Sequence, residues 1–145
     1  MRGVFTTRSE AETERVASDL ARSLRNVDVV YLWGDLGAGK TCFARGLAAG
    51  LGAAPREVAS PTFSLLHEYA ASDGTIILRH LDLYRVEDRT ADLEALGVPE
   101  VTRGAPVAVE WPGKALRRIL PPTIEVRIDP RQDGSRRIAL EEPSP

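Results

Sequence analysis

The sequence predicts an α/β domain whose mixed sheet has a parallel core and antiparallel hairpins. The first reason is an apolar, β-branched run at 27–33, which is typical of a buried strand. The second is a glycine-rich loop followed by a helical pattern, because strand–loop–helix units build parallel sheets. The third is two pairs of short apolar segments joined by turn residues, which indicate hairpins. With 145 residues, the chain is expected to form a single domain over 1–145, with its last few residues frayed.

Each element follows from hydrophobic periodicity and from the residues that bound it. The opening helix is expected at 9–24, because Ser9 and Glu12 match a capping box. Further helical segments are expected at 41–51, 90–96 and 114–120. Strands are expected at 27–33, 63–69, 75–81, 106–111, 123–128 and 136–140.

Composition excludes several classes of protein. The 19 basic and 21 acidic residues give a net charge of −2, which argues against a protein that mainly coats nucleic acid. No apolar run approaches the roughly 20 residues that span a bilayer, and the first residues lack the apolar core of a signal peptide. One cysteine excludes an internal disulfide and a cysteine-built metal site. We therefore expect a cytoplasmic protein without a membrane partner.

A phosphate-binding loop is predicted where the strand at 27–33 ends. Residues 34–41 read "GDLGAGKT", a glycine and four residues followed by Gly39, Lys40 and Thr41. Glycines let successive backbone N–H groups point at one anion, and the following helix adds its unpaired N–H groups and positive dipole end. Lys40 would place an ammonium between the β- and γ-phosphates, and the Thr41 hydroxyl would coordinate Mg²⁺. The expected architecture is thus a three-layer, P-loop NTPase-like fold.

A phosphate loop needs a carboxylate for its metal, and two strand ends supply candidates. Asp82 follows the strand at 75–81, and Glu110 lies at the end of the apolar run in the strand at 106–111. Acidic residues at such strand ends hold the metal in these folds. Thr62, in "SPT", is a candidate second hydroxyl for the metal, as in nucleotide switches. His80 shares a strand face with Asp82, so it either flanks the site or is structural.

ATP is the expected nucleotide by default. The guanine-reading pattern Asn/Thr-Lys-x-Asp is missing, because Lys40 and Lys114 each follow a glycine. Two alternatives to an ATPase use the same loop: a kinase for a nucleoside or other small molecule, and a nucleotide-binding module without turnover. The kinase is disfavoured because no stretch looks like an acceptor-binding lid with clustered arginines.

Four motifs in this order resemble the TsaE family, also called YjeE: "GDLGAGKT", "SPTF", "HLDLYR" and "VEWP". The resemblance covers about 6–128. It implies a small bacterial ATPase that needs ATP and Mg²⁺ and acts with TsaB and TsaD. Together they form N6-threonylcarbamoyladenosine next to the anticodon of tRNAs that read codons beginning with A. TsaD carries the transferase site, tRNA is met only through the complex, and ATP hydrolysis would reset that complex.

The resemblance also implies roles for individual residues. Lys40 and Glu110 are expected to be catalytic, and the metal is expected to involve Thr41, Thr62, Asp82 and Glu110. The nucleotide is expected to contact Gly34, Asp35, Leu36, Gly37, Ala38, Gly39, Lys40, Thr41, Cys42 and Trp111. Which of Asp82 and Glu110 binds the metal directly stays open. At Cys42 the sequence departs from the family, which commonly has a second threonine there, and a thiol is a poorer hydrogen-bond donor.

No arginine stands out as a built-in finger that would stabilise the γ-phosphate. Arg45 lies beyond the first turn of the helix that follows the loop, and Arg85 lies close to acidic residues with which it could pair. Hydrolysis is therefore expected to be slow in the isolated protein and to be stimulated by the partners.

Overall fold

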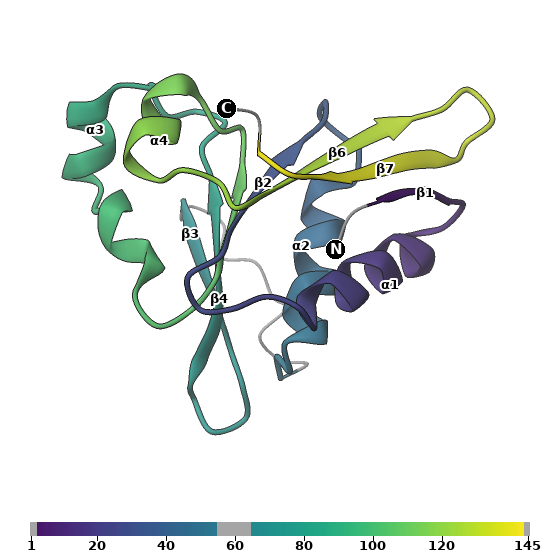
Figure 1. Cartoon of the computed structure of the whole chain (residues 1–145), viewed down its shortest axis with the longest axis horizontal. Helices are drawn as coiled ribbons and strands as arrows, with labels where there is room; N and C mark the ends of the chain where they lie inside the picture. The colour runs from purple at the N-terminus through teal and green to yellow at the C-terminus, as the bar shows by residue number, and fades with distance from the viewer. Residues whose placement is uncertain (1–2, 55–64, 144–145) are drawn as a thin grey trace.

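A computed structural model describes residues 3–54 and 65–143, and it shows a three-layer α/β fold with helices on both faces of a seven-stranded sheet (Figure 1). The strands are β1 (Gly3–Thr7), β2 (Val29–Trp33), β3 (Leu66–Ala70), β4 (Ile76–Asp82), β5 (Val107–Glu110), β6 (Ile124–Pro130) and β7 (Arg136–Glu141). The helices are α1 (Glu10–Ala21), α2 (Lys40–Gly50), α3 (Thr90–Ala95), the 3-10 helix η2 (Val98–Thr102) and α4 (Lys114–Ile119).

The sheet has the predicted parallel core and antiparallel edges. Its strand order is β1-β7-β6-β2-β5-β4-β3. The pairs β6–β2, β2–β5 and β5–β4 are parallel, whereas β3–β4, β6–β7 and β1–β7 are antiparallel. The fold class predicted from the sequence is confirmed, although β1 was not expected, and the strand expected at 63–69 begins outside the described residues.

Successive side chains of β2 point to opposite faces of the sheet, and so they pack in two separate layers of the core. Val30 and Leu32 pack against α1 and α2, whereas Val29 and Tyr31 pack with the layer that contains α3 and α4. All four side chains are at most 3% exposed. A strand buried on both faces lies in the middle of a three-layer fold, which is why its sequence reads as a continuous apolar run.

Two glycines set the close packing of α1 against α2. A Cβ atom at Gly46 would lie 2.6 Å from the carbonyl oxygen of Glu14, and one at Gly50 would lie 2.7 Å from that of Ser18. No side chain fits at those distances, so the two helices approach each other closely only because both positions are glycine. α2 ends at Gly50, near the predicted end.

Asp88 joins the segment after β4 to the segment after β5. Its two carboxylate oxygens accept hydrogen bonds from the backbone N–H groups of Ala115 and Leu116, at 3.0 and 3.1 Å, and so cap α4. Any Cβ atom at Gly113 would collide with this carboxylate.

Among the described residues, no helix has the length and apolar content needed to cross a membrane.

We predict that Asp88→Ala lowers the free energy of unfolding by about 0.5–2 kcal/mol, the usual loss when a helix cap is removed. Urea unfolding at constant m-value measures the change. Glu87→Ala is the matched control, because this neighbouring carboxylate is exposed and should change stability by no more than about 0.5 kcal/mol. Equal midpoints for the two variants would show that the cap does not stabilise the fold.

Candidate active site

The loop at 34–39 connects β2 to α2 and has backbone conformations that favour glycine. Gly34 has φ 154°, and a Cβ atom there would lie 2.8 Å from the carbonyl oxygen of Ile128. Gly39, the N-cap of α2, has φ 116° and no side chain to cap the helix. The first N–H groups of α2 therefore have no side-chain cap, as in an anion site at a helix N-terminus.

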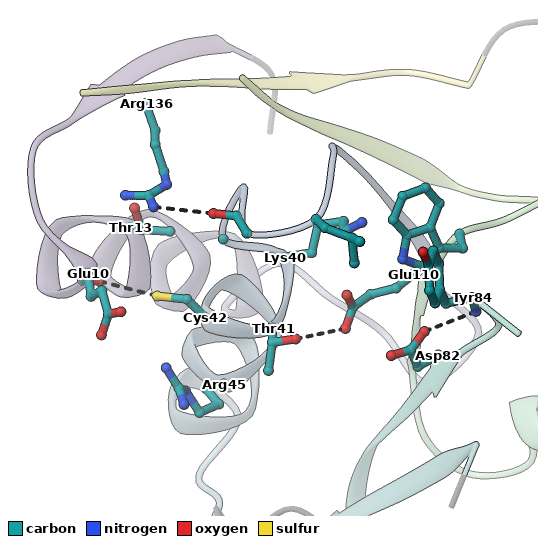
Figure 2. A pocket seen from close by; sticks show the side chains of 14 residues that line it. Glu10, Thr13, Lys40, Thr41, Cys42, Arg45, Asp82, Tyr84, Glu110 and Arg136 are labelled. Carbon is teal, nitrogen blue, oxygen red and sulfur yellow. Dashed lines mark hydrogen bonds between the residues drawn. The ribbon is translucent and has the colours of Figure 1, made fainter. Parts of the chain in front are cut away.

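A cavity of about 360 Å³ lies against this loop. It is bounded by the start of α1, the loop, the first two turns of α2, and residues at and after the ends of β4 and β5 (Figure 2). Its lining residues are Glu10, Thr13, Leu36, Gly37, Gly39, Lys40, Thr41, Cys42, Arg45, Asp82, Tyr84, Glu110, Trp111 and Arg136. Most of the residues expected from the sequence to contact nucleotide or metal thus surround one cavity.

Glu110 lies at the centre of a hydrogen-bonded group. Its Oε2 atom accepts a hydrogen bond from the Thr41 hydroxyl at 3.1 Å and lies 2.6 Å from Nε2 of His80. Burial alone would raise the pKa of Glu110, but its interactions with His80, Thr41 and Lys40 outweigh burial and hold this pKa below its ordinary value. Glu110 is therefore ionised at neutral pH, although it is only 4% exposed.

Lys40 lines the cavity and is buried against the loop. Only 4% of the residue is exposed. Its Nζ atom donates to the carbonyl oxygen of Gly34 at 2.5 Å and lies 3.5 Å from the centroid of the Trp111 ring. Burial lowers the pKa of Lys40, while the carboxylates of Glu110, Asp82 and Asp35 oppose that change.

Trp111 has an unusual backbone conformation directly after β5. Its φ of 60° is the only positive value at a non-glycine residue in the described part of the chain. A bulky residue in this region is strained, and such strain is found mostly at functional sites. The ring lies 4.9 Å from that of Tyr84, which follows β4, so aromatic side chains cover the cavity next to Glu110.

Asp82 lies beside Glu110 but is more accessible. The two residues are register partners on the neighbouring parallel strands β4 and β5. Asp82 is exposed, and its Oδ1 accepts a hydrogen bond from the backbone N–H of Tyr84 at 3.1 Å. Thr41 bonds to Glu110 and not to Asp82. Thr62 lies outside the described residues, so its predicted place at the metal stays a prediction.

Arg136 is a site residue that the sequence did not indicate. It begins β7, and its Nε donates to the carbonyl oxygen of Ala38 at 2.6 Å, while Nη2 lies 3.5 Å from that of Gly37. A side chain near the C-terminal end of the sequence therefore contacts the backbone of the loop at Gly37 and Ala38 (Figure 2). Arg45 lines the same cavity. Two arginines thus lie at the cavity, and whether either stabilises the γ-phosphate as a finger stays a prediction.

Cys42 packs against α1. Its Sγ lies 3.6 Å from the carbonyl oxygen of Glu10, and the residue is 7% exposed. Burial raises the pKa of this thiol, with Glu14 adding to the effect, so the helix start does not favour a thiolate here. Cys42 also lines the cavity, so its expected contact with the nucleotide stays a prediction.

The oxygen atoms at this site suit an Mg²⁺ ion that nucleotide phosphates also bind. They suit a metal ion held by protein side chains alone less well. No group of three His, Cys, Asp or Glu side chains within 3–54 and 65–143 is arranged to hold an ion. Mg²⁺ in nucleotide sites takes only one or two protein oxygens and completes its shell with phosphate oxygens and water. Thr41, Glu110 and Asp82 present oxygens of that kind at the start of α2, where phosphates would bind.

Comparison with known proteins gives consistent matches. The family described as "Threonylcarbamoyl adenosine biosynthesis protein TsaE" matches residues 7–138. A protein of Rickettsia conorii named tRNA threonylcarbamoyladenosine biosynthesis protein TsaE is 39% identical over 133 residues, which is 92% of this chain and 74% of that protein. The protein of the same name from Treponema pallidum is 37% identical over 135 residues, covering 92% of this chain and 96% of its own length.

A solved structure agrees with the sequence matches. The crystal structure of YdiB from Bacillus subtilis superimposes with a TM-score of 0.73 and 29% identity, covering 99% of this chain and 87% of that one. The family match spans the loop, the ends of β4 and β5, and the start of β7, which are the segments that surround the cavity. From its sequence, its fold and these matches, the chain belongs to the TsaE family.

Proposed function

We propose that this protein is an Mg²⁺-dependent ATPase of the cytoplasm, which acts with TsaB and TsaD in forming N6-threonylcarbamoyladenosine on tRNA. The observation that carries the proposal is a single cavity that brings together the glycine loop, Lys40 and the hydrogen bond between Thr41 and Glu110. The names of the relatives support the tRNA-modification part of the proposal and give no support to a metabolite kinase.

Different groups of the site would bind the phosphates, hold the metal and activate water. Backbone N–H groups of the loop and of the start of α2 bind the phosphates, and Lys40 adds a positive charge next to them. When bound, Mg²⁺ would neutralise charge on the phosphate oxygens, and Thr41 with one or both carboxylates would hold it. Glu110 is ionised, so it can also orient the attacking water and accept its proton.

Two aromatic residues line the end of the cavity where the reaction is proposed to occur. The rings of Tyr84 and Trp111 lie beside Glu110 and Asp82, and they leave a partly apolar rim. Tyr84 itself is 49% exposed, so this rim is open to a partner surface in the isolated chain. A partner that covers it would exclude water and strengthen every charge interaction in the site.

Lys40→Ala is predicted to weaken ATP binding about ten- to a hundredfold, since a hydrogen bond to a charged group contributes about 1.5–3 kcal/mol. Calorimetric titration with ATP measures the Kd, and circular dichroism checks the fold. Lys114→Ala is the matched control, because Lys114 is the other lysine of the chain and is exposed. If a folded Lys40→Ala variant bound ATP as tightly as the Lys114→Ala control, the loop would not be the phosphate site.

The two carboxylates are predicted to have different effects. Asp82→Asn should weaken ATP binding in the presence of Mg²⁺ and not in EDTA, because it removes charge near the metal. Glu110→Ala should keep ATP bound but lower kcat about 10²–10⁴-fold, the usual contribution of a general base. Titrations with and without Mg²⁺, and steady-state phosphate release, separate the two effects. Hydrolysis by Glu110→Ala at the wild-type rate would refute the assignment of Glu110.

The partners are predicted to stimulate ATP hydrolysis. Phosphate release by the isolated protein at saturating ATP and Mg²⁺ should be slow, and addition of purified TsaB and TsaD should raise it. Supply of missing charge stabilisation can raise such rates by up to about 10³–10⁵-fold. Equal rates with and without the partners would leave a self-sufficient ATPase and would remove partner activation from the proposal. No phosphate release in either mixture would leave a binding module.

A further inference from the structure

His80 contacts the proposed catalytic carboxylate and has no role in the function proposed above. It lies on β4, two residues before Asp82, and its side chain is 9% exposed. Its Nε2 is 2.6 Å from Oε2 of Glu110, which is shorter than the Thr41 contact to the same atom at 3.1 Å. The shorter of the two hydrogen bonds of Glu110 is therefore with a residue that does not line the cavity.

The two contacts leave the carboxylate of Glu110 asymmetric. Both hydrogen bonds end on Oε2, and within 3–54 and 65–143 none ends on Oε1. An ionised carboxylate has only acceptor sites, so His80 must donate its Nε2–H to make this bond. One oxygen is thus fixed by two donors from different elements, and the other is left for an incoming group. In Figure 2 the carboxylate points from β5 toward the first turn of α2.

We propose that His80 is a positioning residue for ATP hydrolysis, which holds Oε2 of Glu110 so that Oε1 faces the attacking water. This inference rests on the proposed function, because it needs a hydrolytic reaction at this site. His80 touches neither the cavity nor any expected nucleotide group, so it acts only through Glu110. The sheet itself fixes the pair, because the parallel pairing of β4 with β5 aligns Asp82 with Glu110 and brings His80 beside it.

A buried donor of this kind orients a reacting group and does not bind the substrate. Without the His80 bond, Oε2 would keep only the Thr41 hydroxyl, whose oxygen is also expected at the metal. The carboxylate would then rotate more freely, and fewer bound ATP molecules would meet it in a reactive geometry. Loss of such an outer partner typically lowers activity about 10–100-fold.

The test compares two polar replacements. In His80→Gln the side-chain amide nitrogen can take the place of Nε2, whereas in His80→Asn it lies nearer the backbone and cannot reach Glu110. We expect His80→Asn to lower kcat with TsaB and TsaD about 10–100-fold at unchanged Kd for ATP, and His80→Gln to restore most of the rate. His67→Asn is the matched control, because His67 is the other histidine of the chain and is not among the residues that line the cavity, so kcat should stay unchanged.

A double variant separates positioning from a structural role. In a Glu110→Ala background, His80→Asn should lower the rate no further, because its effect passes through the missing carboxylate. Calorimetric ATP binding shows that each variant is folded. Three results would overturn the inference: a wild-type kcat for His80→Asn, an equal loss for His80→Gln, or the same fractional loss with and without Glu110. If the wild-type protein with its partners released no phosphate, the proposed function would fail first, and this inference with it.

Discussion

The parallel pairing of β2, β5 and β4 is the constraint on which the site depends. Leu32, Glu110 and Asp82 form one row across these strands, because Glu110 is the register partner of both others. Parallel strands end at the same edge of a sheet, so the loop that leaves β2 must emerge beside the two carboxylates. A shift of β5 by one residue would turn Glu110 toward the opposite layer, away from Thr41. The hydrogen bond between Thr41 and Glu110 is thus a consequence of sheet register.

The parts of the site that the sequence predicted share one property, which is that local patterns encode them. The glycine spacing of 34–41 and the apolar runs before Asp82 and Glu110 are read within windows of a few residues. The missed parts all depend on distant partners. β1 is stabilised by pairing with β7 at the other end of the chain, as in the pair Gly3–Leu140. A five-residue segment has no local pattern that reports such a partner.

Arg136 and His80 show the same limit inside the site. Arg136 reaches the loop across 98 positions, and the sequence around it reads as an ordinary half-exposed strand. His80 was expected either to flank the site or to be structural, and the sequence could not show that a buried carboxylate lies 2.6 Å from it. Contacts between side chains on neighbouring strands depend on strand order, and strand order was not determined by the patterns that predicted the strands.

The buried position of Lys40 changes how ATP affinity should be understood. A buried ammonium without partners would be costly, and here the Gly34 carbonyl and the Trp111 ring satisfy it before any phosphate arrives. If ATP binds here as proposed, its phosphate oxygens would compete with these contacts, and only the difference would appear as affinity. The same contacts keep the ammonium in the loop, so little further side-chain entropy would be lost if a nucleotide bound as proposed. Trp111 therefore contributes to the site in two ways. Its ring contacts the Lys40 ammonium, and its backbone, with φ 60°, follows the end of β5 directly after Glu110.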